Sequence, residues 1–277
     1  YVEAVNYDSE KLNRNAVPII DLEKSKMERI DAIGKKILLI DDEATKGWSD
    51  VLKVLFKTSN PTTDFQILAR KVNGWSAFTD EEKKLILDTG FDLFLIDLRL
   101  TGSEEEDTAM PENFSGTDVM RQIKQHNAGN QVIMFTASNK AWNLKALLDF
   151  GADGYYIKES PEYNFPESFS NENLRNFKNE SELCLRNSFL KETWAAHEYI
   201  KTWLKNDILR QKYTSGQQTS INQIVAQLDI AYRLVKMRQS QSVSYFVVTY
   251  VRTLEILVEM FVLIDEARKT VALNDGG

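Results

Sequence analysis

Five short apolar runs, separated by longer amphipathic stretches, constrain the fold of this chain more than any other feature. The runs are residues 37–40, 65–69, 93–96, 132–135 and 155–157. Helical periodicity marks the segments between them, near 46–58, 79–89, 116–127 and 139–150. Strands that alternate with helices in this way form a parallel sheet with helices on both faces. We therefore predict an α/β domain, flavodoxin-like and doubly wound, with a five-stranded parallel sheet in the order 2-1-3-4-5.

Polar residues stand directly after four of these apolar runs. Asp41 and Asp42 follow the first run, Asp97 the third, Thr136 the fourth and Lys158 the fifth. Because parallel strands all point the same way, their carboxyl ends meet at one edge of the sheet, where open α/β sheets bind ligands. We therefore expect carboxylates, a hydroxyl and an ammonium group to lie together at that edge.

This set of groups suits phosphoryl transfer. Clustered carboxylates repel one another and raise each other's pKa unless a cation neutralises them. Mg²⁺ binds to a few carboxylates together with water and phosphate oxygens. With the metal present, the carboxylate of Asp97 can attack phosphorus and form an aspartyl phosphate. Lys158 would neutralise one phosphoryl oxygen, and the Thr136 hydroxyl would hydrogen-bond to another.

Four segments resemble the strand signatures of receiver domains of two-component response regulators, similar to the chemotaxis regulators. They are KKILLIDDE (35–43), FDLFLIDLRL (91–100), VIMFTASN (132–139) and GADGYYIKES (151–160). The resemblance covers about residues 36–160, and the motifs are specific only when taken together. It implies a phosphorelay protein that accepts a phosphoryl group from a sensor histidine kinase or a phosphotransfer protein.

The resemblance also implies a role for each site residue. Asp97 matches the phosphoacceptor, and Asp42 matches a direct metal ligand. Asp41 matches the neighbouring acid that helps to hold the metal, so that Asp41, Asp42 and Asp97 form the expected Mg²⁺ site. Thr136 and Lys158 match the switch hydroxyl and the phosphate-binding lysine. Tyr155 matches the aromatic switch position, although an aromatic residue there could simply pack.

Each feature alone has an ordinary explanation. Paired aspartates often cap helices or turns, and Thr136 could be a helix N-cap. A receiver fold used as a scaffold without phosphorylation is therefore the competing hypothesis. Two departures from the family pattern stand out. Glu159-Ser160-Pro161 follows Lys158 where proline usually comes next, and the acidic loop 101–114 is longer than the family norm. That loop could tune kinase access or be a solvated insertion.

The pattern changes after Pro161, where helical spacing replaces strands. We predict three segments: residues 1–34, an N-terminal extension or the end of an upstream segment; 35–160, the receiver domain; and 161–277, an all-α output or dimerisation domain. Helices are expected near 219–238 and 242–272. The chain begins with Tyr1 rather than Met, which is consistent with a fragment of a longer protein.

Three readings of the tail remain open. Residues 221–236 faintly resemble a DNA-binding helix-turn-helix, but the tail carries as many acidic as basic residues, which makes nucleic acid an unfavoured partner. An incomplete enzymatic domain has no motif to support it. The favoured reading is a helical bundle for protein contact, including a homodimer, because residues 243–264 are apolar over more than one helix face.

Composition limits the compartment and the partners. Cys184 is the only cysteine, which favours a reducing cytoplasm. The net charge of −7 does not favour nonspecific binding to nucleic acid or anionic lipid. Arg252, Glu255 and Glu259 interrupt the apolar segment 243–265, so we expect no membrane span. The predicted role is signalling rather than metabolism, in a cytoplasmic phosphoprotein that catalyses its own phosphorylation and dephosphorylation.

Overall fold

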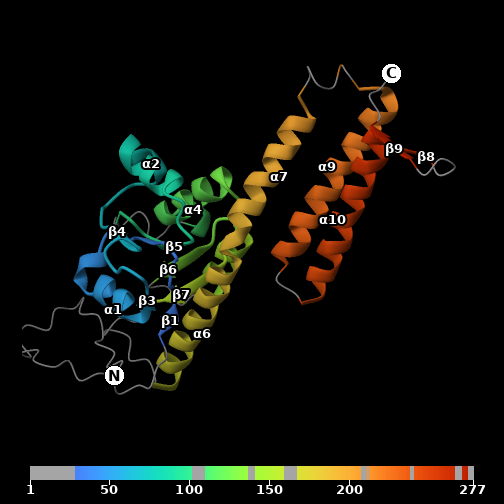
Figure 1. Cartoon of the computed structure of the whole chain (residues 1–277). Helices are drawn as coiled ribbons and strands as arrows, with labels where there is room; N and C mark the ends of the chain where they lie inside the picture. Colours follow the sequence, from blue (N-terminus) through green and yellow to red (C-terminus); the bar gives the residue numbers. More distant parts are fainter. Residues whose placement is uncertain are drawn as a thin grey trace, which may run out of the picture. The chain divides into compact units, whose positions relative to one another are not determined.

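The computed structural model describes residues 29–101, 110–136, 141–158, 167–206, 211, 213–237, 240–265 and 270–273. The chain forms two compact units, Tyr1–Phe189 and Leu190–Gly277. Figure 1 shows the parallel sheet in the first unit and long helices in the second.

The first unit is built on a parallel sheet of five strands. In spatial order these are β4 (Phe65–Leu68), β2 (Ile37–Ile40), β5 (Leu93–Asp97), β6 (Val132–Thr136) and β7 (Gly154–Ile157). Counted along the chain they are the second, first, third, fourth and fifth strands of this sheet, and every neighbouring pair is parallel. The predicted α/β fold with a five-stranded parallel sheet is confirmed.

Four helices connect these strands within a few residues of the predicted positions: α1 (Trp48–Leu55), α2 (Asp80–Asp88), α4 (Ser115–His126) and α5 (Ala141–Asp149). Helix α6 (Glu167–Arg186) follows the last strand, and the described residues also form short 3-10 turns η1 (Ala44–Lys46), η2 (Trp75–Ala77), η3 (Pro111–Asn113) and η4 (Asn187–Phe189). A separate pair of short strands, β1 (Ile30–Asp31) and β3 (Phe56–Lys57), is also parallel. Part of the segment 1–34 therefore contributes an extra strand.

Alternate residues of each central strand enter opposite cores, as the two-residue period of a strand requires. On β2, Ile37 and Leu39 belong to one buried cluster, whereas Leu38 and Ile40 belong to the other. Helices α1 and α6 cover the first face, and α2, α4 and α5 contribute to the second (Figure 1). Burial on both faces explains why these strands are continuously apolar in sequence.

Helix α6 belongs to the first unit, which differs from the predicted boundary at residue 160. Its Phe177 ring packs against Phe135 of β6 at 5.4 Å and Tyr156 of β7 at 4.8 Å, measured between ring centroids. Phe56 lies 6.0 Å away from the same ring. Helical spacing in the sequence identifies α6 as amphipathic but does not say which surface buries its apolar face. The sheet still needs a helix on this face, and α6 supplies it.

The second unit contains α7 (Leu190–Leu204), α9 (Ser215–Lys236) and α10 (Ser240–Phe261). Helix α9 begins with a capping box, in which the Thr214 hydroxyl accepts a hydrogen bond from the Gln217 N–H and the Gln217 side chain accepts from the Thr214 N–H. Helices α9 and α10 run side by side (Figure 1), and α7 packs on α9. Residues from all three helices form a small core: Leu204, Ile221, Ile224, Val225, Leu228, Ile256 and Met260.

Residues 221–236 lie inside the single helix α9, so the structure does not bear out the less favoured helix-turn-helix interpretation of this segment. The predicted helical character of the tail is confirmed. The helix expected near 242–272 ends at Phe261, however, and β8 (Val262–Asp265) and β9 (Thr270–Leu273) pair as an antiparallel hairpin. Both strands are rich in β-branched residues, which favour strands, whereas an apolar run alone does not distinguish a strand from a buried helix. Among the described residues, no helix is long and apolar enough to cross a membrane.

We predict that Phe177→Ala lowers the free energy of unfolding of the first unit by about 3–5 kcal/mol, because it leaves a cavity against β6 and β7. The measurement is equilibrium urea denaturation followed by hydrogen exchange in those two strands. Leu148→Ala, which removes an exposed side chain of α5, is the control and should change stability by less than about 0.5 kcal/mol. Equal effects of the two variants would show that α6 is not part of this core.

Candidate functional site

The candidate site lies at the carboxyl edge of the parallel sheet. Asp41 directly follows β2, Asp97 and Thr136 are the last residues of β5 and β6, and Lys158 directly follows β7. Backbone hydrogen bonds fix the strand ends beside one another: the Lys158 N–H donates to the Thr136 carbonyl at 2.6 Å, and the Asp41 N–H donates to the Leu68 carbonyl at 3.3 Å. The topology thus brings together the residues that the sequence predicted to meet.

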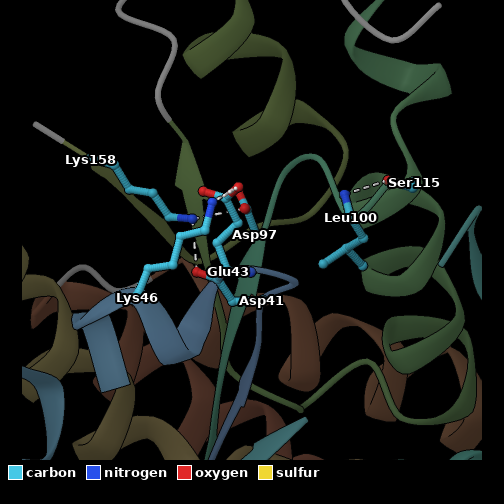
Figure 2. A network of polar contacts seen from close by, with 7 residues as sticks. All are labelled: Asp41, Glu43, Lys46, Asp97, Leu100, Ser115 and Lys158. Carbon is cyan, nitrogen blue, oxygen red and sulfur yellow. Dashed lines mark hydrogen bonds and ion pairs between the residues drawn. The ribbon is translucent and has the colours of Figure 1, made fainter. Parts of the chain in front are cut away.

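Lys158 joins two of the strand ends through its ammonium group. Its Nζ lies 2.8 Å from Asp41 Oδ2 and 2.7 Å from Asp97 Oδ2 (Figure 2). The Asp41 side chain is fully buried, and those of Asp97 and Lys158 are each 12% exposed. Such pairs are desolvated, so removing one partner alone leaves an uncompensated charge.

Three carboxylates converge beside this ion pair. One oxygen from each of Asp41, Asp42 and Asp97 lies within 4.8 Å of the others. Asp41 is further held by the backbone N–H of Glu43, which donates to Asp41 Oδ1 at 2.8 Å. Glu43 itself forms an ion pair with Lys46 at 2.7 Å (Figure 2). Oxygen donors in this number suit a hard divalent cation such as Mg²⁺, with water completing the coordination.

Burial and mutual repulsion destabilise the charged form of these acids. Burial raises the pKa of Asp97 to about 6; Lys158 opposes the shift, and Asp41 and Asp42 add to it. Burial, followed by the charges of Asp41 and Glu43, also raises the pKa of Asp42. For Lys158, burial favours the neutral amine, but Asp97 and Asp41 outweigh it and the net pKa is raised. The site therefore carries more negative charge than Lys158 neutralises.

Thr136 and Tyr155 occupy neighbouring strands beside this cluster. Thr136 is buried and pairs in register with Ile157, one residue before Lys158. Tyr155 is half-buried on β7 and pairs in register with Met134. Tyr156 packs into the core under α1 and α6, so Tyr155 points to the other face of the sheet. This placement is compatible with either the switch role or simple packing.

Gly116 supports the position of Asp97, a role that the sequence did not reveal. A Cβ atom added at Gly116 would lie 1.9 Å from the Asp97 carbonyl oxygen, so only glycine allows α4 to begin this close to β5. The Gly116 N–H donates to the Leu98 carbonyl at 3.1 Å. Next to it, the Ser115 hydroxyl accepts a hydrogen bond from the Leu100 N–H at 2.7 Å (Figure 2). From sequence, Gly116 was interpreted only as a break between elements.

Two sequence features lie outside the described residues. They are Glu159-Ser160-Pro161 after Lys158, and residues 102–109, which make up most of the acidic loop.

Comparison with known proteins gives likenesses among solved structures. No protein-family model matches the chain, and no curated protein matches it. A CheY-like response regulator receiver domain protein from Methanospirillum hungatei is 21% identical, with a TM-score of 0.33, and the match covers 53% of this chain and 96% of that chain. The receiver domain of NtrX from Brucella abortus is 16% identical, with a TM-score of 0.35, covering 55% of this chain and 98% of that chain.

A third similar structure is the BeF3-activated N-terminal receiver domain of RstA from Klebsiella pneumoniae. It is 19% identical, with a TM-score of 0.32, covering 51% of this chain and 96% of that chain. All three of these similar structures are receiver domains of response regulators, and each match covers about half of this chain.

We predict that Gly116→Ala lowers the free energy of unfolding by about 1–3 kcal/mol, because the new methyl group collides with the backbone of Asp97. Thermal unfolding measures this change. Gly216→Ala is a matched control: an added Cβ there has Thr214 Oγ1 as its nearest neighbour, at 3.9 Å. The control should be neutral or stabilising. A neutral Gly116→Ala would contradict the close approach of α4 to β5.

We predict that the stability of Asp97→Asn relative to wild type is higher at pH 8 than at pH 4, measured as thermal unfolding in the presence of a chelator. The pKa of Asp97 rises from 3.8 to about 6 on folding, so the folded state binds more protons within that window. Its contribution to stability is therefore present at low pH and lost as the pH rises through about 6. Asparagine cannot ionise and escapes this loss.

Asp50→Asn, on the exposed surface of α1, is the control for this experiment and should follow the wild-type pH profile. An Asp97→Asn variant whose melting temperature differs from wild type by the same amount at both pH values would contradict the assignment.

Proposed function

We propose that this chain is the response regulator of a two-component phosphorelay and accepts a phosphoryl group on Asp97. The observation that carries the proposal is the convergence of Asp41, Asp42 and Asp97 around one point, with Lys158 bonded to two of them. Catalysis of phosphoryl transfer is mostly positioning and charge stabilisation. It requires oxygen ligands for a cation and a lysine near the phosphoryl oxygens, and this cluster supplies both.

In this proposal Asp97 is the nucleophile. One of its carboxylate oxygens forms a bond to phosphorus while the bond from phosphorus to a phosphohistidine nitrogen, in a sensor kinase or phosphotransfer protein, breaks. The released imidazole keeps its electron pair and takes a proton from solvent. Hydrolysis by water later returns the free carboxylate, so the chain catalyses its own phosphorylation and dephosphorylation but has no metabolic substrate.

Asp41, Asp42 and Asp97 would hold Mg²⁺, and their spacing and oxygen chemistry fit that ion. When bound, Mg²⁺ would supply the positive charge that offsets the carboxylates and the incoming phosphoryl oxygens. The raised pKa values of Asp42 and Asp97 are caused first by burial and then by neighbouring carboxylates, and a bound cation would favour the ionised form of both groups.

Lys158 and Thr136 would contact the phosphoryl group on Asp97. Lys158 already contacts Asp97 Oδ2 and would transfer this contact to a phosphoryl oxygen, leaving Asp41 free for the metal. The Thr136 hydroxyl would bond to another phosphoryl oxygen, with Tyr155 as the coupled aromatic residue. Phosphorylation would thereby shift a two-state equilibrium at the ends of β6 and β7.

The proposal also includes an output, in which the helical second unit contacts another protein. The proposed location is the cytoplasm, which fits the single buried Cys184.

The test is intact-mass spectrometry after incubation with Mg²⁺ and acetyl phosphate. Wild type and Asp50→Asn should each gain one phosphoryl group, and Asp97→Asn should gain none, because the nucleophile is lost. The gain should disappear when Mg²⁺ is chelated, and hydroxylamine should reverse it, as expected for an acyl phosphate. If wild type gains no mass while Mg²⁺ raises its melting temperature, the scaffold hypothesis replaces this one.

A further inference from the structure

Lys158 reaches its two carboxylates from the last strand of the sheet. It directly follows β7, which ends the spatial order β4-β2-β5-β6-β7. Its ammonium nevertheless contacts Asp97 of β5 and Asp41 after β2, so the side chain passes the end of β6 (Figure 2). A lysine side chain has a long, flexible stem and loses much rotamer freedom when it is fixed. Whether the ammonium meets both carboxylates therefore depends on how the backbone presents the side chain.

The peptide group that joins Ile157 to Lys158 is hydrogen-bonded on both sides. Its N–H, which belongs to Lys158, donates to the Thr136 carbonyl at 2.6 Å. Its carbonyl, which belongs to Ile157, accepts a hydrogen bond from the side-chain amide of Asn173, with Nδ2 at 2.9 Å. A peptide group is planar and carries its N–H and C=O on opposite edges. The two bonds together therefore fix its orientation, and with it the direction in which the Lys158 side chain leaves the backbone.

Asn173 belongs to α6, which apolar packing holds on the sheet. Helix α6 lies along β7 (Figure 1). Phe177 stands one turn after Asn173, on the same side of the helix, and packs against Phe135 of β6 and Tyr156 of β7. The helix is thus anchored to the two strands that end beside the candidate site, and Asn173 adds a polar contact at the end of β7.

The chemistry of asparagine suits this position. Ile157 is buried, and a backbone carbonyl that is buried without a partner costs free energy. The amide NH₂ donates to this carbonyl without adding a charge. A lysine or arginine would bring a second cation toward the carboxylates that Lys158 neutralises, and an aspartate would turn one acceptor toward another.

We propose that Asn173 is a positioning residue for Lys158. Its side-chain amide holds the peptide group before Lys158, so that the ammonium meets both Asp41 and Asp97. In the phosphorylated protein, the same bond would keep the backbone in place while the ammonium turns toward a phosphoryl oxygen. That consequence rests on the phosphoacceptor function proposed above, whereas the positioning of Lys158 in the unmodified protein can be measured without it.

The first test is trace labelling of lysines with acetic anhydride, measured by mass spectrometry on the full chain with a chelator and without a phosphodonor. Asn173→Ala removes the donor, and Asn173→Asp replaces it by an acceptor of similar shape. In both variants the labelling of Lys158 should rise about fivefold, the equilibrium factor of one typical hydrogen bond. Asn176→Asp makes the same change at an exposed asparagine of α6. This matched control should label as wild type does.

Lys124 separates positioning from a general loss of stability. Its side chain is 10% exposed, against 12% for Lys158, and it forms an ion pair with Asp153, directly before β7. The two lysines therefore report on opposite ends of the same strand. Labelling of Lys124 should stay at the wild-type level in both Asn173 variants. An equal rise at both lysines would show that Asn173 only stabilises the fold, and would overturn the proposal.

The second test is the rate of phosphorylation by acetyl phosphate. In Asn173→Ala and Asn173→Asp the rate at which Asp97 is modified should fall about fivefold, because Lys158 is less often in place to neutralise a phosphoryl oxygen. The affinity for Mg²⁺, measured by calorimetry, should not fall, because the three carboxylates that would hold the ion are unchanged. General damage to the site would weaken both properties, so a loss of Mg²⁺ affinity in both variants would contradict a role through Lys158.

The two tests separate this proposal from the phosphoacceptor function. A selective rise in Lys158 labelling, in a chain whose wild type acetyl phosphate never modifies, would remove the phosphoacceptor function and support the positioning role. Normal phosphorylation of wild type, with unchanged Lys158 labelling in both Asn173 variants, would overturn the positioning role and leave the phosphoacceptor function in place.

Discussion

The double ion pair of Lys158 with Asp41 and Asp97 is the contact on which the candidate site depends. It joins residues at the ends of β2, β5 and β7, three strands that come from distant parts of the chain. The contact exists because the strands are parallel and end at the same edge. Buried ion pairs are expensive to desolvate and are poor stabilisers. Their presence here is better explained by chemistry than by stability, since an apolar trio would hold the strands at lower cost.

The ion pair leaves the site with excess negative charge, and the proposed function depends on this imbalance. One ammonium faces three carboxylates, and the pKa of Asp97 stays raised to about 6 although Lys158 lies 2.7 Å away. A divalent cation would relieve the excess charge, while a phosphoryl group would add to it and draw Lys158 away from Asp41. In the proposed function the same few residues would respond in opposite ways to metal and to phosphorylation, as a switch biased by charge requires.

Much of the sheet and of its functional edge could be predicted from the sequence, because both follow from local patterns. Apolar runs locate the strands, and the residue after each run is placed by topology. Contacts that depend on three-dimensional fit could not be predicted. Phe177 has helical spacing whichever surface it packs against, and a single Gly116 does not reveal that Asp97 lies against it. The hairpin of β8 and β9 could not be predicted, because an apolar run is compatible with a strand as well as with a buried helix.

Helix α6 gives the candidate site a physical connection to the rest of the chain. Phe177 packs on Phe135 and Tyr156, the residues directly before Thr136 and directly after Tyr155. Trp48 contacts the same two rings from α1. A displacement of the ends of β6 and β7 would change the packing under α6, because close-packed aromatic rings have little free space to absorb it. Helix α6 leads through η4 directly into α7. For phosphorylation of Asp97 to affect the second unit by this route, the packing of Phe177 would have to differ between the two states.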